Sequence, residues 1–169
     1  MINLVHSLQS EWIKVRRSLV GWLILGAAFF VPLIVLASRL RRPDQLPALY
    51  RTPGFWEKLW TMNWEANSIM ILPLTMILVT SLVVQIEYRN NTWKQLHASP
   101  QRWITIYVAK LIVVLIVLFQ LLALFNLAML LCGVLPALLF ADVALPLAAF
   151  PLLAFWDRSA RYFVDTLPI

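Results

Sequence analysis

Few side chains in this sequence could perform chemistry, and none stands at a spacing that chemistry requires. His6 and His97 are isolated histidines without a second ligand at metal-binding spacing, so they predict no zinc site. Cys132 is the only cysteine, which excludes an intrachain disulfide and favours an inert buried thiol. The sequence also lacks a phosphate loop, a His-Glu-x-x-His pair, a nucleophile elbow and paired carboxylates within its apolar runs. We therefore expect no catalytic residue, no bound metal and no cofactor.

Two features superficially suggest a site. Gly21 and Gly26 echo the spacing of a phosphate loop, but Ala27 and Ala28 occupy the positions where lysine and serine or threonine are needed. The two glycines instead predict close packing between helices. Asp142 is the only acid deep in an apolar stretch, where an ionisable residue is a functional candidate by default. It could equally mark a loop between two apolar segments.

The most informative polar segment is EYRNNTWKQLHASPQRW, at residues 87–103, which lies between two long apolar runs. Asn91 and Thr92 are residue types that start helices, and Thr92 with Gln95 fits a capping box. This pattern predicts a compact helical elbow over residues 87–101 that joins two spanning helices.

The elements that must position this elbow are apolar runs of a length suited to a membrane. Residues 18–38, 66–86 and 104–132 are such runs, and about 20 residues at 1.5 Å each cross a hydrocarbon core of about 30 Å. Pro73 is compatible with the second run, because neighbouring groups in a membrane protein can satisfy the freed carbonyl. The predicted fold class is therefore all-α, a polytopic helical membrane protein with about three spanning helices.

The third run carries further expectations. Lys110 lies near enough to its start for the amine to snorkel to the membrane surface. The helix is expected to end near Cys132, with Gly133 as a left-handed terminator and Pro136 just beyond. Asn126, a polar residue within the run, predicts structural hydrogen bonding rather than a substrate site.

The remaining segments predict contact with the membrane surface. Residues 1–17 form an amphipathic stretch, which is expected to lie at the interface as a helix. Residues 39–65 carry three tryptophans spaced four apart, which share one helix face and suit the headgroup level. Residues 137–156 include a short uncharged run interrupted by prolines, which suits a re-entrant or interfacial segment. The predicted interfacial anchors are Trp12, Lys14, Arg16, Arg17, Trp56, Trp60 and Trp64.

Composition also indicates a lipid environment. Of the 169 residues, 62% are hydrophobic and 13% charged, whereas soluble domains carry about a quarter charged residues. The net charge of +6 is concentrated beside the apolar runs, where bases meet lipid headgroups, so nucleic acid is not an expected partner. Residues 1–17 and 87–110 hold seven Lys and Arg, against five with three acids in residues 39–65. This bias predicts a multi-pass protein of the cell membrane with a cytoplasmic N-terminus.

Two stretches, SEWIKVRRSLVGWLIL and IEYRNNTWKQLHASPQRWITIYVAKL, resemble the membrane subunits of type-2 ABC exporters. The nearest resemblance is to the lantibiotic-immunity-like branch, also described as multidrug-type permeases. In that family an acidic residue ends the second helix, and a "gTWk.L...P" elbow leads into a third helix that carries a lysine. The matching residues here are Glu87, Thr92, Trp93, Lys94, Leu96, Pro100 and Lys110, while Asn91 replaces a glycine found in many members.

The resemblance implies that a separate ABC ATPase subunit hydrolyses ATP and that the elbow docks into it as a coupling helix. A second permease subunit, identical or different, is the other implied protein partner, and membrane lipid surrounds both. The open alternative is that the elbow charges are only the positive flanks of spanning helices. The predicted ATPase-coupling residues are Glu87, Tyr88, Arg89, Asn91, Thr92, Trp93, Lys94, Gln95 and Leu96.

Permeases of this kind have about six spanning helices, and the final Leu167-Pro168-Ile169 resembles the entry to their fourth. Residues 1–169 are therefore expected to be a single transmembrane permease domain and the N-terminal part of such a subunit. The first functional hypothesis is export of an amphiphilic peptide, lipid or drug-like compound. The alternative is a non-transporting membrane anchor or sensor module, or a truncated permease remnant. Gln85, Gln120 and Asn126 are too generic to identify a substrate.

Overall fold

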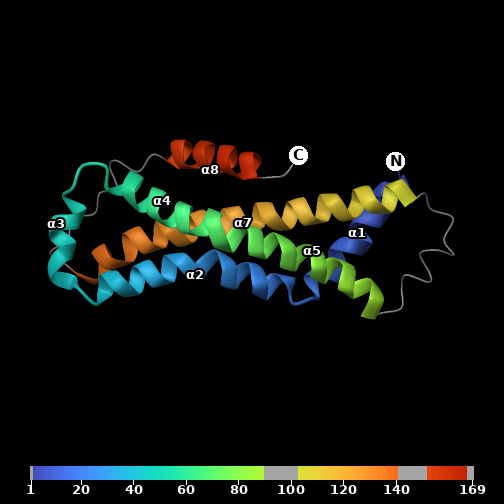
Figure 1. Ribbon diagram of the computed structural model, residues 1–169, viewed down its shortest axis with the longest axis horizontal. Coiled ribbons are helices and arrows are strands. Elements are labelled where there is room, and N and C mark those ends of the chain that lie inside the picture. Colours follow the sequence, from blue (N-terminus) through green and yellow to red (C-terminus); the bar gives the residue numbers. More distant parts are fainter. Residues whose placement is uncertain (1, 90–102, 141–151, 167–169) are drawn as a thin grey trace. The chain divides into compact units, whose positions relative to one another are not determined.

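The structure is a computed structural model that describes residues 2–89, 103–140 and 152–166. In these residues the regular structure is entirely helical, which confirms the predicted all-α fold class (Figure 1). The elements in chain order are α1 (Ile2–Arg16), α2 (Val20–Leu40), the short 3₁₀ turn η1 (Pro43–Gln45), α3 (Leu46–Tyr50), α4 (Phe55–Ala66), the π-helical turn η2 (Asn67–Ile71), α5 (Leu72–Arg89), α7 (Trp103–Leu139) and α8 (Leu152–Thr166).

Three helices are long and apolar enough to cross a membrane, as the sequence predicted. They run over Val20–Leu40, Phe55–Ile86 and Ile104–Leu139. The second begins at Phe55 rather than at residue 66, because α4, η2 and α5 follow one another without a break. The segment predicted as a separate interfacial helix is therefore continuous with the span.

The π-helical turn η2 occurs where this long helix meets a proline. In η2 the N–H of Leu72 donates to the carbonyl of Asn67, one residue further back than in an α-helix. Pro73 follows directly and cannot donate to the carbonyl of Ile69 four residues earlier. A local π adjustment is a known way for a membrane helix to accommodate a proline without ending.

The third span corrects the predicted helix end. Gly133 was expected to terminate the helix in a left-handed conformation, but α7 continues through it and through Pro136 to Leu139. Among the described residues, Gly54 is the glycine with positive φ, at 74°, and it precedes α4. The reason lies in the packing, because Gly133 contacts Trp56 so closely that its lack of a side chain serves helix contact rather than helix termination.

The described residues form two compact units. The first comprises residues 1–26 and 73–121, which contain α1, the start of α2, nearly all of α5 and the first half of α7. Its buried apolar residues recur at helical spacing, so that each helix buries one face. They include Val79 and Val83 of α5 and Ile106, Ala109, Val113 and Val117 of α7.

The second unit comprises residues 27–72 and 122–169, which contain the rest of α2, η1, α3, α4, η2, the end of α7 and α8. Its core is aromatic where α4 meets α7. The buried residues there include Phe55, Trp56, Leu59, Trp60, Trp64, Phe125, Met129 and Cys132. Of the predicted re-entrant segment, residues 137–139 belong to α7 and 152–156 to α8, while 141–151 lie outside the described residues.

Candidate functional site

The predicted coupling elbow is described by the structure only at its borders. Glu87, Tyr88 and Arg89 form the last turn of α5, and α7 begins at Trp103. The other predicted coupling residues, Asn91 to Leu96, lie outside the described residues. Of the three residues on α5, Tyr88 is the one whose side chain is described, and it is 68% exposed.

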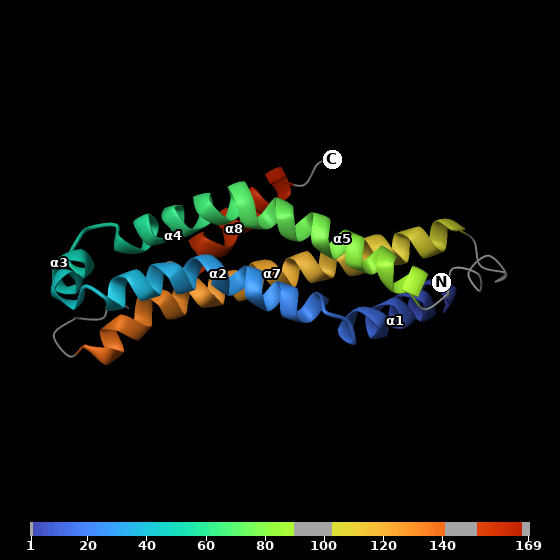
Figure 2. The ribbon, with the colours of Figure 1, turned by 60° about the horizontal axis from the view of Figure 1, so that its bottom comes forward.

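Three elements of the first unit gather at the borders of the elbow. The end of α5, the start of α7 and the helix α1 lie at the same end in both views (Figures 1 and 2). Both α5 and α7 belong to helices that are long and apolar enough to cross a membrane.

Lys110, which the sequence placed at the membrane surface, lies about two turns into α7. Its amine is buried, so it does not extend out along the helix to the headgroups as predicted.

The helix α1 attaches to its unit through a partly polar face. Ser7, Glu11 and Val15 are buried and stand four apart, so they lie on one side of the helix. Glu11 forms a salt bridge with Lys14, one of the predicted anchors, which is half-buried. Arg16 and Arg17 are exposed and Trp12 is half-buried, so these anchor predictions stay predictions.

The indole side chains of α4 are arranged differently from the predicted anchors. Trp56, Trp60 and Trp64 share one helix face as expected, but that face is buried, with exposed fractions of 3–6%. Trp60 and Trp64 stack with ring centroids 5.7 Å apart, and Trp64 lies 5.6 Å from the ring of Phe125 in α7. Each aromatic ring buries roughly 150–250 Å² when it packs, so these contacts contribute strongly to the packing of α4 in its unit, while the depth of the three rings in a membrane stays a prediction.

A chain of hydrogen bonds crosses the same packing and joins three helices. The Trp60 Nε1–H donates to the Ser159 hydroxyl of α8 at 3.3 Å, and that hydroxyl donates to Asn126 Oδ1 of α7 at 3.1 Å. The Asn126 amide donates in turn to the carbonyl of Leu122 at 2.9 Å. The structural role predicted for Asn126 is confirmed. Ser159 was missed, because a serine in a charged tail carries no sequence signal of burial.

Two further asparagines on α4 and η2 are buried. Asn63 and Asn67 are 0% and 2% exposed, and neither side-chain oxygen has a hydrogen-bond partner among the described residues. The Asn63 amide donates to the carbonyl of Leu59 at 2.8 Å. Within the described part of the chain, no group of histidine, cysteine or acidic residues could hold a metal ion. On this face, the hydrogen bonds that join one helix to another are therefore those of Trp60, Ser159 and Asn126.

The end of α7 is completed by side chains from α2 and α3. Pro136 cannot donate to the carbonyl of Cys132 four residues earlier, and Arg39 Nη1 approaches that carbonyl at 3.5 Å. The Tyr50 hydroxyl donates to the carbonyl of Gly133. Burial raises the pKa of Tyr50 above its ordinary value of 10.0, an effect that the Arg39 guanidinium partly opposes, so the hydroxyl keeps its proton at neutral pH.

Comparison with known proteins adds one finding to this geometry. A family model described as "ABC-2 family transporter protein" matches residues 7–156, which is most of the chain. A search of curated proteins and a search of solved structures matched nothing.

Proposed function

Because the chain belongs to the ABC-2 family of transporter proteins, it is a membrane-spanning permease subunit of an ABC transporter, and we propose that it couples a separate ATPase to export through residues 87–101. ATP hydrolysis belongs to the partner in this proposal. The Thr-Trp-Lys motif at residues 92–94 supports a place in the lantibiotic-immunity-like, multidrug-type branch. The exported compound is an amphiphilic peptide, a lipid or a drug-like molecule.

The observation that carries the coupling proposal is the convergence of α1, the end of α5 and the start of α7 at the borders of the elbow (Figures 1 and 2). A helix resists bending because each turn is hydrogen-bonded to the next. Movement of residues 90–102 by a docked ATPase would therefore displace α5 and α7 together. We infer that the elbow lies in the cytoplasm and that the N-terminus lies on the same side of the membrane.

A second permease subunit has a candidate contact surface on α5. Ile77, Thr80, Ser81, Val84, Gln85 and Tyr88 line an open groove of about 670 Å³. The side chain of Thr80 is exposed, and its hydroxyl donates a hydrogen bond of 2.8 Å to the carbonyl of Met76 in the same helix. Polar residues on an exposed helix face in lipid are stabilised when a second helix covers them. This supports a dimer, with the same chain or with a sister subunit.

The test is co-purification of the tagged full chain from membranes in mild detergent, with identification of its partners by mass spectrometry. We expect a stoichiometric ABC ATPase with the unchanged chain. The double variant Trp93→Ala, Lys94→Glu should lose the ATPase while its insertion into the membrane is unchanged. The reason is that it removes an apolar contact and reverses a charge in the elbow.

Lys58→Glu is the matched control, because Lys58 is exposed on α4 and carries the same charge as Lys94. This variant should keep the ATPase at the level of the unchanged chain. Normal ATPase recovery with the double variant would contradict the coupling proposal. Recovery of the chain alone, or with a signalling kinase, would favour the anchor or sensor alternative.

A further inference from the structure

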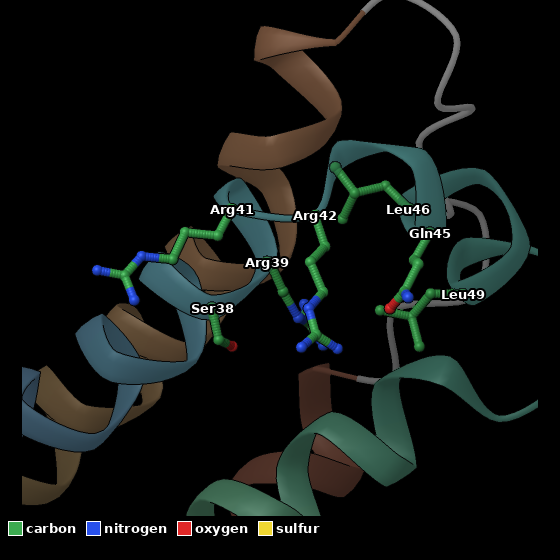
Figure 3. Close-up of a pocket in the computed structure, with 7 residues that line it drawn as sticks. All are labelled: Ser38, Arg39, Arg41, Arg42, Gln45, Leu46 and Leu49. Carbon is green, nitrogen blue, oxygen red and sulfur yellow. The ribbon is translucent and has the colours of Figure 1, made fainter.

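The end of α2 and the turn that follows it form a pocket in the second unit, of about 440 Å³. Figure 3 shows its lining, which comes from the last turn of α2, from the two residues that follow it, from η1 and from α3. The residues are Ser38, Arg39, Arg41, Arg42, Gln45, Leu46 and Leu49. We call it the arginine pocket.

Three of these residues are arginines within four positions of one another, and the lining holds no acid. Among the described residues, no salt bridge reaches any of the three. In Figure 3 the guanidinium groups of Arg39 and Arg42 extend in the same direction, while Arg41 extends to the opposite side. Positive groups directed into one space repel each other, and an anion between them relieves that repulsion.

Arg39 is held in place by its own contacts. Its guanidinium lies 5.1 Å from the centroid of the Phe55 ring and 3.5 Å from the carbonyl oxygen of Cys132. Arg42 is exposed and completes the pair from the turn after the helix. A fixed guanidinium with a second one beside the same space is the arrangement that recognises phosphate oxygens, because each presents several N–H donors in one plane.

The remaining lining indicates what the phosphate is attached to. Leu46 is buried and Leu49 is 40% exposed, so the pocket has an apolar wall next to its charged one. It lies at the end of a helix long enough to cross the membrane, where lipid headgroups are found. We propose that the arginine pocket binds the phosphate group of an anionic lipid headgroup, a function separate from ATPase coupling.

The test measures lipid binding by the purified full chain in an uncharged detergent, without any ATPase, so its result does not depend on the coupling proposal. Short-chain phosphatidylglycerol is the probe, and native mass spectrometry counts the bound molecules. Arg42→Gln should weaken binding by about tenfold, because it removes a charge-assisted contact. Arg41→Gln is the matched control, because it removes the same charge from a side chain that extends away from Arg39 and Arg42. It should weaken lipid binding by about twofold or less at physiological salt.

Inorganic phosphate as a competitor distinguishes the two sources of the same group. If inorganic phosphate leaves the lipid bound, and Arg42→Gln weakens lipid binding while Arg41→Gln does not, the ligand is a lipid headgroup as proposed. If phosphate displaces the lipid at equal concentration, the pocket recognises phosphate but takes it from solution, which overturns the lipid assignment. If Arg42→Gln and Arg41→Gln weaken lipid binding equally, the proposed site is wrong. It is also wrong if Arg42→Gln keeps its helix content and binds the lipid as well as the unchanged chain.

Discussion

Gly133 shows how a single residue acquires a role from its surroundings. A Cβ at this position would lie 2.6 Å from Trp56 Cη2 and 3.3 Å from Leu59 Cδ2, closer than such atoms pack. The absence of a side chain therefore allows α7 to approach α4 at the indole of Trp56. Small residues at helix contacts are the usual means by which membrane helices approach closely.

We predict that Gly133→Ala destabilises the protein by about 1–3 kcal/mol, because the added methyl group overfills a packed interior. Thermal unfolding of the purified chain in detergent, followed by circular dichroism, measures the change. Adding Trp56→Leu to the variant should recover part of the loss, since the smaller side chain leaves room for the methyl group.

Gly26→Ala is the control for this prediction. Gly26 is also helical, but a Cβ there meets no atom within 4 Å, and the same holds for Gly21. The close packing predicted for these two glycines is therefore not found in the described chain. Alanine at residue 26 should be neutral or stabilising by up to about 1 kcal/mol, through helix propensity alone. An equal loss in both variants would show that Gly133 acts through the backbone instead of through Trp56.

At the scale of the element, α7 continues past a proline because other elements supply donors to its carbonyls. Arg39 of α2 approaches the carbonyl of Cys132, and Tyr50 of α3 donates to that of Gly133. Inside a membrane an unsatisfied carbonyl costs several kcal/mol. These contacts therefore help α7 to remain helical up to Leu139. The short α3 thus has a structural purpose that its five residues alone would not suggest.

We predict that Tyr50→Phe lowers the free energy of unfolding by about 1 kcal/mol at neutral pH, the usual net value of a hydrogen bond. The folded pKa of Tyr50 is raised, so the stability it contributes is fully present below its ordinary pKa of 10.0. That contribution is lost as the pH rises through the raised value. Urea unfolding of both proteins at neutral and at alkaline pH should therefore show a difference that shrinks with alkali. If the difference in the free energy of unfolding between the two proteins is the same at neutral and alkaline pH, the Tyr50 hydroxyl does not lose its proton in the folded protein over this range.

For the whole molecule, the three helices long enough to span predict how the chain is divided between the two sides of a membrane. One span, Val20–Leu40, separates α1 from the turn and helix at residues 43–50. A second, Phe55–Ile86, returns the chain towards the elbow. We therefore expect the elbow and α1 on one side of the membrane and the arginine pocket on the other, and the excess of bases in the first group predicts that its side is the cytoplasm.

Labelling of single cysteines with an impermeant maleimide in intact cells tests this topology, after Cys132 is replaced by alanine. Thr52→Cys should react from outside, because Thr52 is exposed in the segment between the first two spans. Ser10→Cys, exposed on α1, should react only after the membrane is permeabilised. The reverse pattern would place the N-terminus outside and would remove the elbow from the reach of a cytoplasmic ATPase.

The sequence by itself determined that the chain is helical and spans the membrane. Apolar runs of about 20 residues leave the backbone few alternatives in lipid, since its polar groups must bond within the segment. The residues of the elbow also carried the resemblance to type-2 ABC permeases, which the family match supports at the level of the family. Both results depend on local signals, namely run length and a short motif.

Only the tertiary structure decided which helix faces meet protein. A spanning helix is apolar all round, so its periodicity does not distinguish a lipid-facing side from a packed one. For α4, which carries charged residues on its other faces, an aromatic stripe suits lipid headgroups as well as a protein partner, so the residues did not indicate that Trp56, Trp60 and Trp64 would be buried against α7 and α8. For the same reason Gly133 was read as a terminator, because close approach by an indole seventy-seven positions earlier in the chain leaves no trace in the residues around it.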